Sequence, residues 1–198
     1  LFAAGLLPSA TKDPFGLRRA ALGVVQPLTE HGLPLDLRQA IQAAADKQPL
    51  PVTTGILDQV LEFIIGRQRV LLLDSGFRHD VVDAVLAVQG HTPHLAKDAI
   101  QQLSAWILPP DWNTILPGYA RCVRITRDQK ESFTLKPEMC LEPAEQDLLS
   151  ALQTAEKVER RPGNVDDFLN VFLPTLPFVN KFFESIMVMA EDTSVREN

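Results

Sequence analysis

A run of basic residues between positions 119 and 130 has the residue types and the spacing to bind phosphate groups. Arg121, Arg124 and Arg127 are three residues apart, so on a helix they form a slowly drifting row along one side. Lys130 extends the row, and Tyr119 offers an edge or a stacking platform at its start. The planar guanidinium of arginine donates hydrogen bonds in pairs, which suits phosphate oxygens and base edges. The row is therefore a candidate nucleic-acid site.

The alternative is that these arginines belong to a solvated helix face and pair with neighbouring carboxylates. Asp128 and Glu131 are close enough in the sequence to be those partners. Charge runs usually mark a face of this kind. The formal net charge of −6 also argues against a protein that binds nucleic acid with its whole surface, so any such contact is local.

The dipeptide His79-Asp80 is a second candidate for chemistry. An HD-type metal phosphohydrolase needs a His, a distant His-Asp pair and a further Asp, all converging on a metal ion. The required partner spacing is absent here, and the dipeptide stands at the start of a predicted helix, where a carboxylate serves the free N–H groups. His91 and His94 have a ligand-like separation, but the two cysteines are too far away in the sequence to be assumed partners. We therefore predict no metal site.

The sequence contains no recognisable nucleophile for covalent catalysis and no glycine-rich phosphate loop. Cys122 and Cys140 do not make a disulfide framework, and we interpret them as reduced thiols. We therefore expect no catalytic residue within this chain.

The apolar residues recur mostly at helical spacing, with proline and glycine as punctuation. We expect helices around residues 14–29, 37–45, 53–73, 81–88, 93–107, 112–127, 142–160, 165–173 and 178–189, the sixth interrupted near Pro117-Gly118. The class is predicted to be all-α, with two helical subdomains that meet near Pro109-Pro110, since two successive prolines cannot continue a helix. No apolar run approaches the roughly 20 residues that a membrane span needs.

Residues 11–25 begin the first predicted helix. Asp13 can accept hydrogen bonds as an N-cap, and Pro14 fits the first helical position, which needs no donor. Arg18 and Arg19 stand beside the apolar face of this helix rather than within it. The chain begins without Met and without a signal peptide, so we expect a piece taken from a longer protein.

The run Asp-Pro-Phe-Gly-Leu-Arg-Arg-Ala-Ala-Leu-Gly-Val over residues 13–24 closely resembles a segment of the bacterial-type glycyl-tRNA synthetase β subunit. Only Gly16, where the family usually has Ala, departs from it. The segment Tyr-Ala-Arg-Cys-Val-Arg-Ile at 119–125 resembles the opening helix of the DALR-type anticodon-binding domain of the same subunit. Residues 141–145 and 182–192 are similar to two further family segments, and Asp192 and Arg196 match the Asp and Arg that name the domain type.

The resemblance implies a division into residues 1–110, the helical body with its HD-like region, and residues 111–198, a DALR-type anticodon-binding bundle truncated at its C-terminus. It implies tRNA binding in support of ATP-dependent attachment of glycine to tRNA(Gly), in the cytoplasm and without a membrane. The α subunit, as a partner or fused in front, would activate the amino acid with ATP and Mg, so we expect no cofactor in this piece.

The resemblance also ranks the candidate RNA-binding residues. Those of residues 119–130 come first, and the basic residues of the first helix are weaker candidates: Arg121, Arg124, Arg127, Lys130, Tyr119, Lys12, Arg18 and Arg19. Two other interpretations stay open, an HD-type metal phosphohydrolase and a helical scaffold that binds only protein.

Overall fold

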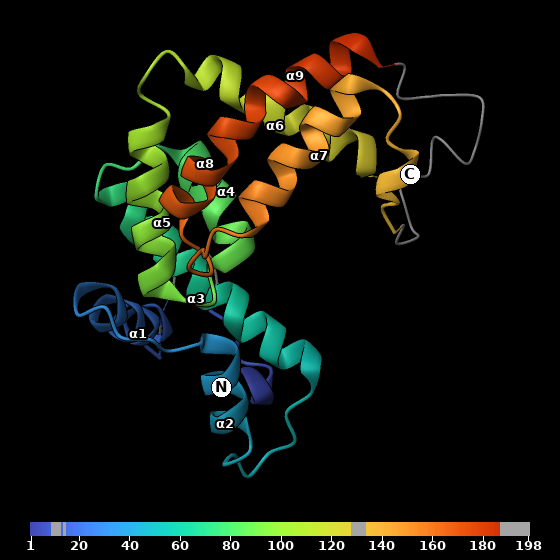
Figure 1. The fold of residues 1–198 in the computed structure, drawn as a ribbon. Coiled ribbons are helices and arrows are strands. Elements are labelled where there is room, and N and C mark those ends of the chain that lie inside the picture. The colour runs from blue at the N-terminus through green and yellow to red at the C-terminus, as the bar shows by residue number, and fades with distance from the viewer. Residues whose placement is uncertain (9–12, 14, 128–133, 187–198) are drawn as a thin grey trace. The chain divides into compact units, whose positions relative to one another are not determined.

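The structure is a computed structural model that describes residues 1–8, 13, 15–127 and 134–186 (Figure 1). Every regular element within these residues is a helix, which confirms the predicted all-α class. The chain divides into two compact units, Leu1–Ala105 and Trp106–Asn198. We call them unit 1 and unit 2.

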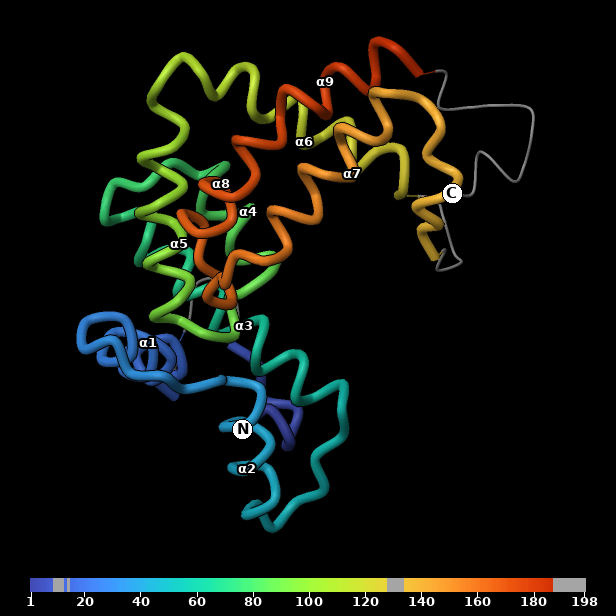
Figure 2. Tube along the Cα trace, viewed as in Figure 1, coloured from blue at the N-terminus to red at the C-terminus, as the bar shows by residue number. Residues whose placement is uncertain are grey.

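Unit 1 is built around one long helix, α3 (Thr54–Asp74), which runs through it in teal in Figures 1 and 2. The elements that pack against α3 are η1 (Phe2–Ala4), α1 (Leu17–Glu30), α2 (Leu37–Ala45) and α4 (His79–Gln89). Helix α5 (Pro93–Trp106) ends at the boundary of the unit. Its buried side chains include Ala96, Ala99 and Ile100.

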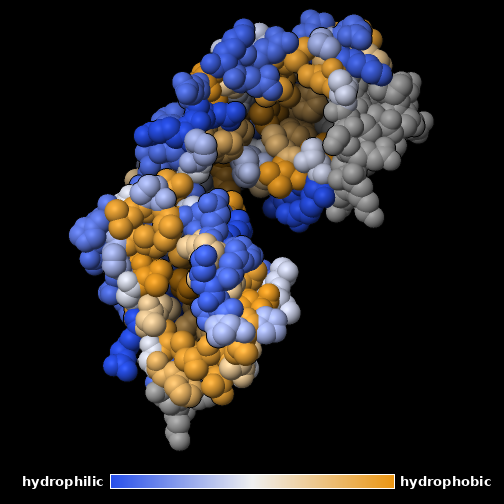
Figure 3. All heavy atoms as spheres, turned by 90° about the horizontal axis from the view of Figure 1, so that it is seen from below, coloured by the Kyte–Doolittle hydropathy of each residue, from blue (hydrophilic) through white to orange (hydrophobic). Residues whose placement is uncertain are grey.

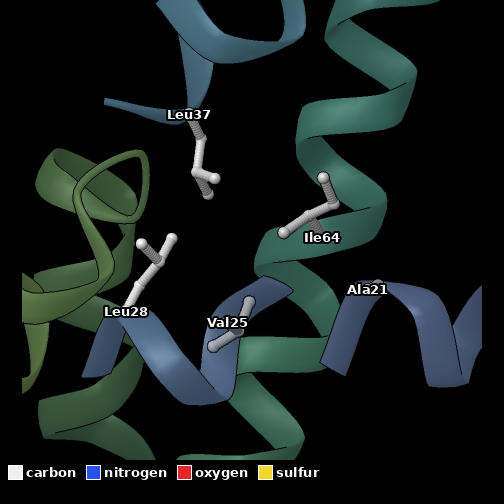
Figure 4. Close-up of a cluster of buried hydrophobic side chains, with 5 residues drawn as sticks. All are labelled: Ala21, Val25, Leu28, Leu37 and Ile64. Carbon is white, nitrogen blue, oxygen red and sulfur yellow. The ribbon is translucent and has the colours of Figure 1, made fainter. Parts of the chain in front are cut away.

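The core of unit 1 joins α1, α2 and α3. Figure 4 shows Leu28 of α1 and Leu37 of α2 pointing toward each other, with Ile64 of α3 reaching in from the side. Val25 and Ala21 complete the cluster one and two turns earlier on α1. Burial of such side chains contributes about 25 cal/mol per Å² of apolar surface, so this cluster is a principal source of the unit's stability.

The interior of unit 1 includes a fully buried amide side chain. Gln68 of α3 is completely inaccessible to solvent, and neither its amide nitrogen nor its amide oxygen has a hydrogen-bond partner among the described residues. Leaving such a group unsatisfied costs about 1–3 kcal/mol, because its bonds to water are lost and not replaced. The interior of unit 1 around α3 therefore contains an amide group that lowers the stability of the unit.

Unit 2 consists of α6 (Trp112–Thr126), η2 (Pro137–Met139), α7 (Pro143–Glu156), α8 (Val165–Phe172), η3 (Leu173–Thr175) and α9 (Leu176–Ser185). Helix α9 packs against both α7 and α6 (Figures 1 and 2). Its buried cluster joins Ile115 of α6, Leu169 of α8 and Leu176 of α9, with Trp106 and Trp112 packed around them.

Helix α6 is continuous, so the predicted interruption at Pro117-Gly118 is wrong. Pro117 removes only one intrahelical donor, and Gly118 has a tertiary role. Gly118 is buried, and a Cβ placed on it would overlap the Cδ1 methyl of Leu176. The missing side chain lets α9 approach the backbone of α6.

Two helix ends also differ from expectation. Helix α1 begins at Leu17 rather than near Pro14, because Gly16 adopts φ 66° just before it. The Asp13 carboxylate still caps the helix, accepting from Leu17 N at 2.8 Å and from Arg18 N at 3.0 Å. Helix α7 ends at Glu156, short of the predicted Arg160.

Hydrophobic side chains reach the surface as well as the core, as the orange areas in Figure 3 show. Phe15, Leu7 and Leu50 are each about half exposed. No described helix combines the length and the apolar character that crossing a membrane requires.

We predict that Gly118→Ala destabilises unit 2 by up to about 2 kcal/mol, although Ala favours a helix by about 1 kcal/mol over Gly. The added methyl must displace the buried Leu176 side chain. Both tryptophans lie in unit 2, so chemical denaturation followed by tryptophan fluorescence measures this effect. In a Leu176→Ala background the same change should become stabilising. Gly66→Ala, at a helical glycine of unit 1 with open space beside it, is the control and should stabilise α3, which far-UV circular dichroism measures.

We predict that Gln68→Met raises the free energy of unfolding of unit 1 by about 1–3 kcal/mol, because Met fills a similar volume without polar atoms to satisfy. Denaturation followed by far-UV circular dichroism measures the change. Gln68→Glu places a carboxyl group at the same site and should destabilise the protein more as pH rises. Equal stability of the Met variant and the parent would contradict an unsatisfied amide.

Candidate nucleic-acid interface

Helix α6 carries the arginine row along its C-terminal half. Arg121 and Arg124 lie within the helix, and Arg127 is its C-cap. At 100° per residue, each step of three residues turns the row by about 60° around the axis. The row therefore starts beside α9 at Arg121 and turns progressively away from it.

Arg121 is held by an aromatic ring of α9. Its guanidinium carbon lies 5.3 Å from the ring centroid of Phe183, within the range of a cation–π contact. Phe183 in turn meets the neighbouring Phe182 ring edge to face, with centroids 5.4 Å apart. The charge of Arg121 is not neutralised by this contact, but its side chain is held on α9.

Tyr119 makes ring contacts on the other flank of α6. Its ring meets Phe168 and Phe172 of α8 edge to face, with centroid distances of 5.7 Å and 5.8 Å. The two phenylalanine rings are stacked at 6.0 Å. Tyr119 keeps 41% of its surface exposed. It is therefore a ring held by two neighbouring rings and still partly accessible to solvent.

Arg124 and Arg127 are both exposed, and no ion pair or ring contact involves them among the described residues. Helix α6 contains no acidic residue of its own. Lys130, Asp128 and Glu131 lie outside the described residues. The solvated-face alternative, which depends on the two acids, therefore stays a prediction.

The weaker candidates belong to unit 1. Arg18 is half buried and its backbone N–H donates to Asp13, while Arg19 is exposed and its guanidinium lies beside Gly16. Lys12 lies outside the described residues. Both residues lie in the first turn of α1. The backbone N–H of Arg18 is capped by Asp13, and the guanidinium of Arg19 lies over the turn at Gly16.

Among the described residues, three other arginines are paired with carboxylates: Arg69, Arg78 and Arg161. Arg69 and Asp83 form an ion pair at 2.5 Å, and Arg161 and Asp167 form one at 2.8 Å. The hydrogen bond from Arg161 is the largest cause that lowers the pKa of Asp167 to about 2. Asp167 also accepts from the backbone N–H of Arg161 at 2.9 Å. These guanidiniums are therefore occupied, unlike those of Arg124 and Arg127.

His79-Asp80 stands at the N-terminus of α4, as predicted. Asp80 accepts from Val81 N at 3.0 Å and pairs with Arg78, and the Arg78 hydrogen bond is the largest cause that lowers its pKa. These contacts give Asp80 a structural role at the helix terminus. No cluster of three or more His, Cys, Asp or Glu side chains suited to a metal ion occurs among the described residues.

A shallow hollow of about 170 Å³ lies between α2 and α3, away from the arginine row in the sequence. Its lining combines Arg38, Gln42, Thr54 and Asp58 with apolar side chains. These lining residues include no group of glycines that would cradle a phosphate.

The contact between Arg121 and Phe183 was not predicted from the sequence. The ring contacts of Tyr119 with Phe168 and Phe172 were not predicted either, and Phe168 keeps 37% of its surface exposed. The spacing of Phe168 and Phe172, one helical turn apart, was the available signal for an aromatic pair on one face. Nothing in the local sequence links Phe183 to Arg121, because they come from separate helices.

Comparison with known proteins gives one consistent result. The family model described as glycyl-tRNA synthetase beta subunit matches residues 1–87. Glycine–tRNA ligase beta subunits from Desulfatibacillum aliphaticivorans and Aromatoleum aromaticum are 33% and 34% identical over the whole chain, which covers 30% and 29% of them. The Arabidopsis thaliana protein named glycine–tRNA ligase, chloroplastic/mitochondrial 2, is 32% identical over the whole chain, which covers 19% of that protein.

The similarity to these relatives extends beyond the residues of the family model and includes α6 and α9. It confirms the resemblance drawn from residues 13–24. The chain spans less than a third of the length of these curated relatives.

We predict that the Arg161–Asp167 pair makes the stability of unit 2 depend on pH in the acid range. Asp167 has a pKa of about 2 in the folded protein, below the ordinary 3.8. A carboxyl whose pKa is depressed by folding stabilises the protein above the ordinary value and ceases to do so as pH falls toward the folded value. Thermal unfolding, monitored by tryptophan fluorescence, should therefore show that unit 2 loses stability as pH falls from about 4 to about 2.

Asp167→Asn should reduce this loss, and Arg161→Gln should reduce it too, because each removes the interaction that lowers the pKa. An unchanged pH profile in both variants would show that other carboxyls account for it.

Proposed function

We propose that this chain, which is related over its whole length to the glycyl-tRNA synthetase β subunit, contributes tRNA binding to glycyl-tRNA synthesis. The observation that carries the proposal is the arginine row of α6. Arg124 and Arg127 are exposed cations without an ion-pair partner among the described residues, on a helix that contains no acid. A phosphate backbone is the ligand that such a surface favours.

The site acts by positioning rather than by bond making. Contacts to the phosphates of the anticodon arm hold the tRNA so that its acceptor end meets chemistry elsewhere in the enzyme. The partly exposed ring of Tyr119 is available for a contact with a base, and Arg121 adds positive charge to the same helix. Unit 2 corresponds in this proposal to the DALR-type anticodon-binding domain, and unit 1 to the helical body.

The rest of the reaction requires partners outside this chain. We propose that an α subunit, separate or fused, binds ATP and Mg and activates glycine in the cytoplasm. Among the described residues there is neither a cluster of metal-ligating side chains nor a glycine-rich phosphate loop.

We predict that Arg124→Ala combined with Arg127→Ala weakens binding of a tRNA(Gly) transcript several-fold. Each lost phosphate contact should also lower the slope of log K against log salt by about 0.7–0.9. Fluorescence anisotropy of labelled tRNA at several salt concentrations measures both quantities. Lys157→Ala combined with Arg160→Ala removes the same charge from unit 2 and is the control, which should leave the slope unchanged.

A second tRNA(Gly) transcript with a changed anticodon tests whether the contact involves the anticodon. Weaker binding of this transcript supports the proposal, and equal binding of both transcripts contradicts anticodon recognition. An unchanged affinity of the double arginine variant would instead favour a scaffold that binds only protein.

A further inference from the structure

The C-terminal half of α6 is held by few buried residues. Ile115 and Gly118 are its buried residues, and every position from Tyr119 to Arg127 is exposed or half buried. The arginines therefore lie on the part of α6 that is least stabilised by buried side chains. Other contacts must fix its direction if the guanidiniums are to meet a ligand in a defined geometry.

Two contacts clamp this half of α6 from opposite flanks. Tyr119 packs on the rings of Phe168 and Phe172 of α8, while Arg121 lies over Phe183 of α9. The two residues are two positions apart, which places them about 200° apart around the helix. One contact therefore restrains the helix toward α8 and the other toward α9.

We infer that Arg121 is a positioning residue, which clamps α6 to Phe183 so that Arg124 and Arg127 project toward an RNA backbone. The inference rests on the proposed function for the ligand, but the clamp itself is a property of the free chain. It assigns different roles to residues that the sequence presents as equivalent members of one row. The guanidinium of Arg121 stacks on the Phe183 ring, whereas the guanidiniums of Arg124 and Arg127 remain available to phosphate oxygens.

Phe183→Leu gives the decisive test, because it removes the ring and leaves every charge in place. In the full chain we expect it to weaken binding of the tRNA(Gly) transcript by about two- to fivefold, the equivalent of an exposed cation–π contact, with an unchanged salt slope. Arg121→Ala combined with Phe183→Leu should weaken binding little more than Arg121→Ala does. Phe183→Tyr, which keeps the ring, should restore the parent affinity.

Phe178→Leu is the matched control. Phe178 lies on the same helix, is 37% exposed and has no ring contact among the described residues, so its replacement should leave the affinity unchanged. Unchanged affinity in Phe183→Leu, together with a lower salt slope in Arg121→Ala, would overturn the inference and make Arg121 a direct phosphate ligand.

Hydrogen exchange of the RNA-free chain separates the two proposals. If the clamp exists, Phe183→Leu speeds amide exchange in residues 122–127 and Phe178→Leu does not. If Phe183→Leu speeds exchange but the parent chain does not bind tRNA, the clamp is supported and the proposed function is contradicted. Unchanged exchange in Phe183→Leu would contradict the clamp, whatever the tRNA affinity.

Discussion

The close approach of α9 to α6 at Gly118 is the contact on which the arrangement of unit 2 depends. Because Gly118 has no Cβ, a methyl of Leu176 occupies the space beside the α6 backbone. The same approach brings Leu176 against Ile115 and Leu169 in the buried cluster. It also sets the distance at which Phe183, about two turns further along α9, reaches Arg121. A backbone contact at one residue thus determines how the arginine-bearing half of α6 is presented.

Ion pairs occupy some of the guanidiniums of this acidic chain. An exposed pair such as Arg69 with Asp83 contributes little to stability, since surface ion pairs are screened by water and salt, whereas the more enclosed Asp167 of the Arg161–Asp167 pair has its pKa lowered by folding. Both pairs do, however, use the hydrogen-bonding capacity of these side chains. The contact of Arg121 with Phe183 differs, because an aromatic ring orients the cation and leaves its charge in place. Local positive potential on α6 therefore coexists with a net charge of −6.

The helical class and most helices were predictable, because apolar periodicity and capping residues are local signals. Asp36 illustrates this, since its carboxylate caps α2 as an aspartate at that position should. The predicted interruption at Pro117-Gly118 was wrong, because a glycine that locally favours a break is needed here for a different reason. Gly118 has no side chain, and this lets Leu176 of α9 pack against the α6 backbone. The arginine row was visible in the sequence, but the roles of its members were not, since Phe183 belongs to a distant segment.

The geometry of the row limits what it can bind. Arg121, Arg124 and Arg127 turn through about 120° of the helix circumference in total, so a backbone lying along one face meets two of them and not all three. With Arg121 on α9, the pair left is Arg124 and Arg127, about 4.5 Å apart along the axis. Two phosphate contacts release few counterions and give modest affinity in an acidic chain. Under the proposed function, such a site would orient a tRNA that other contacts hold, and two phosphate contacts would suit that role better than they suit an independent RNA-binding module.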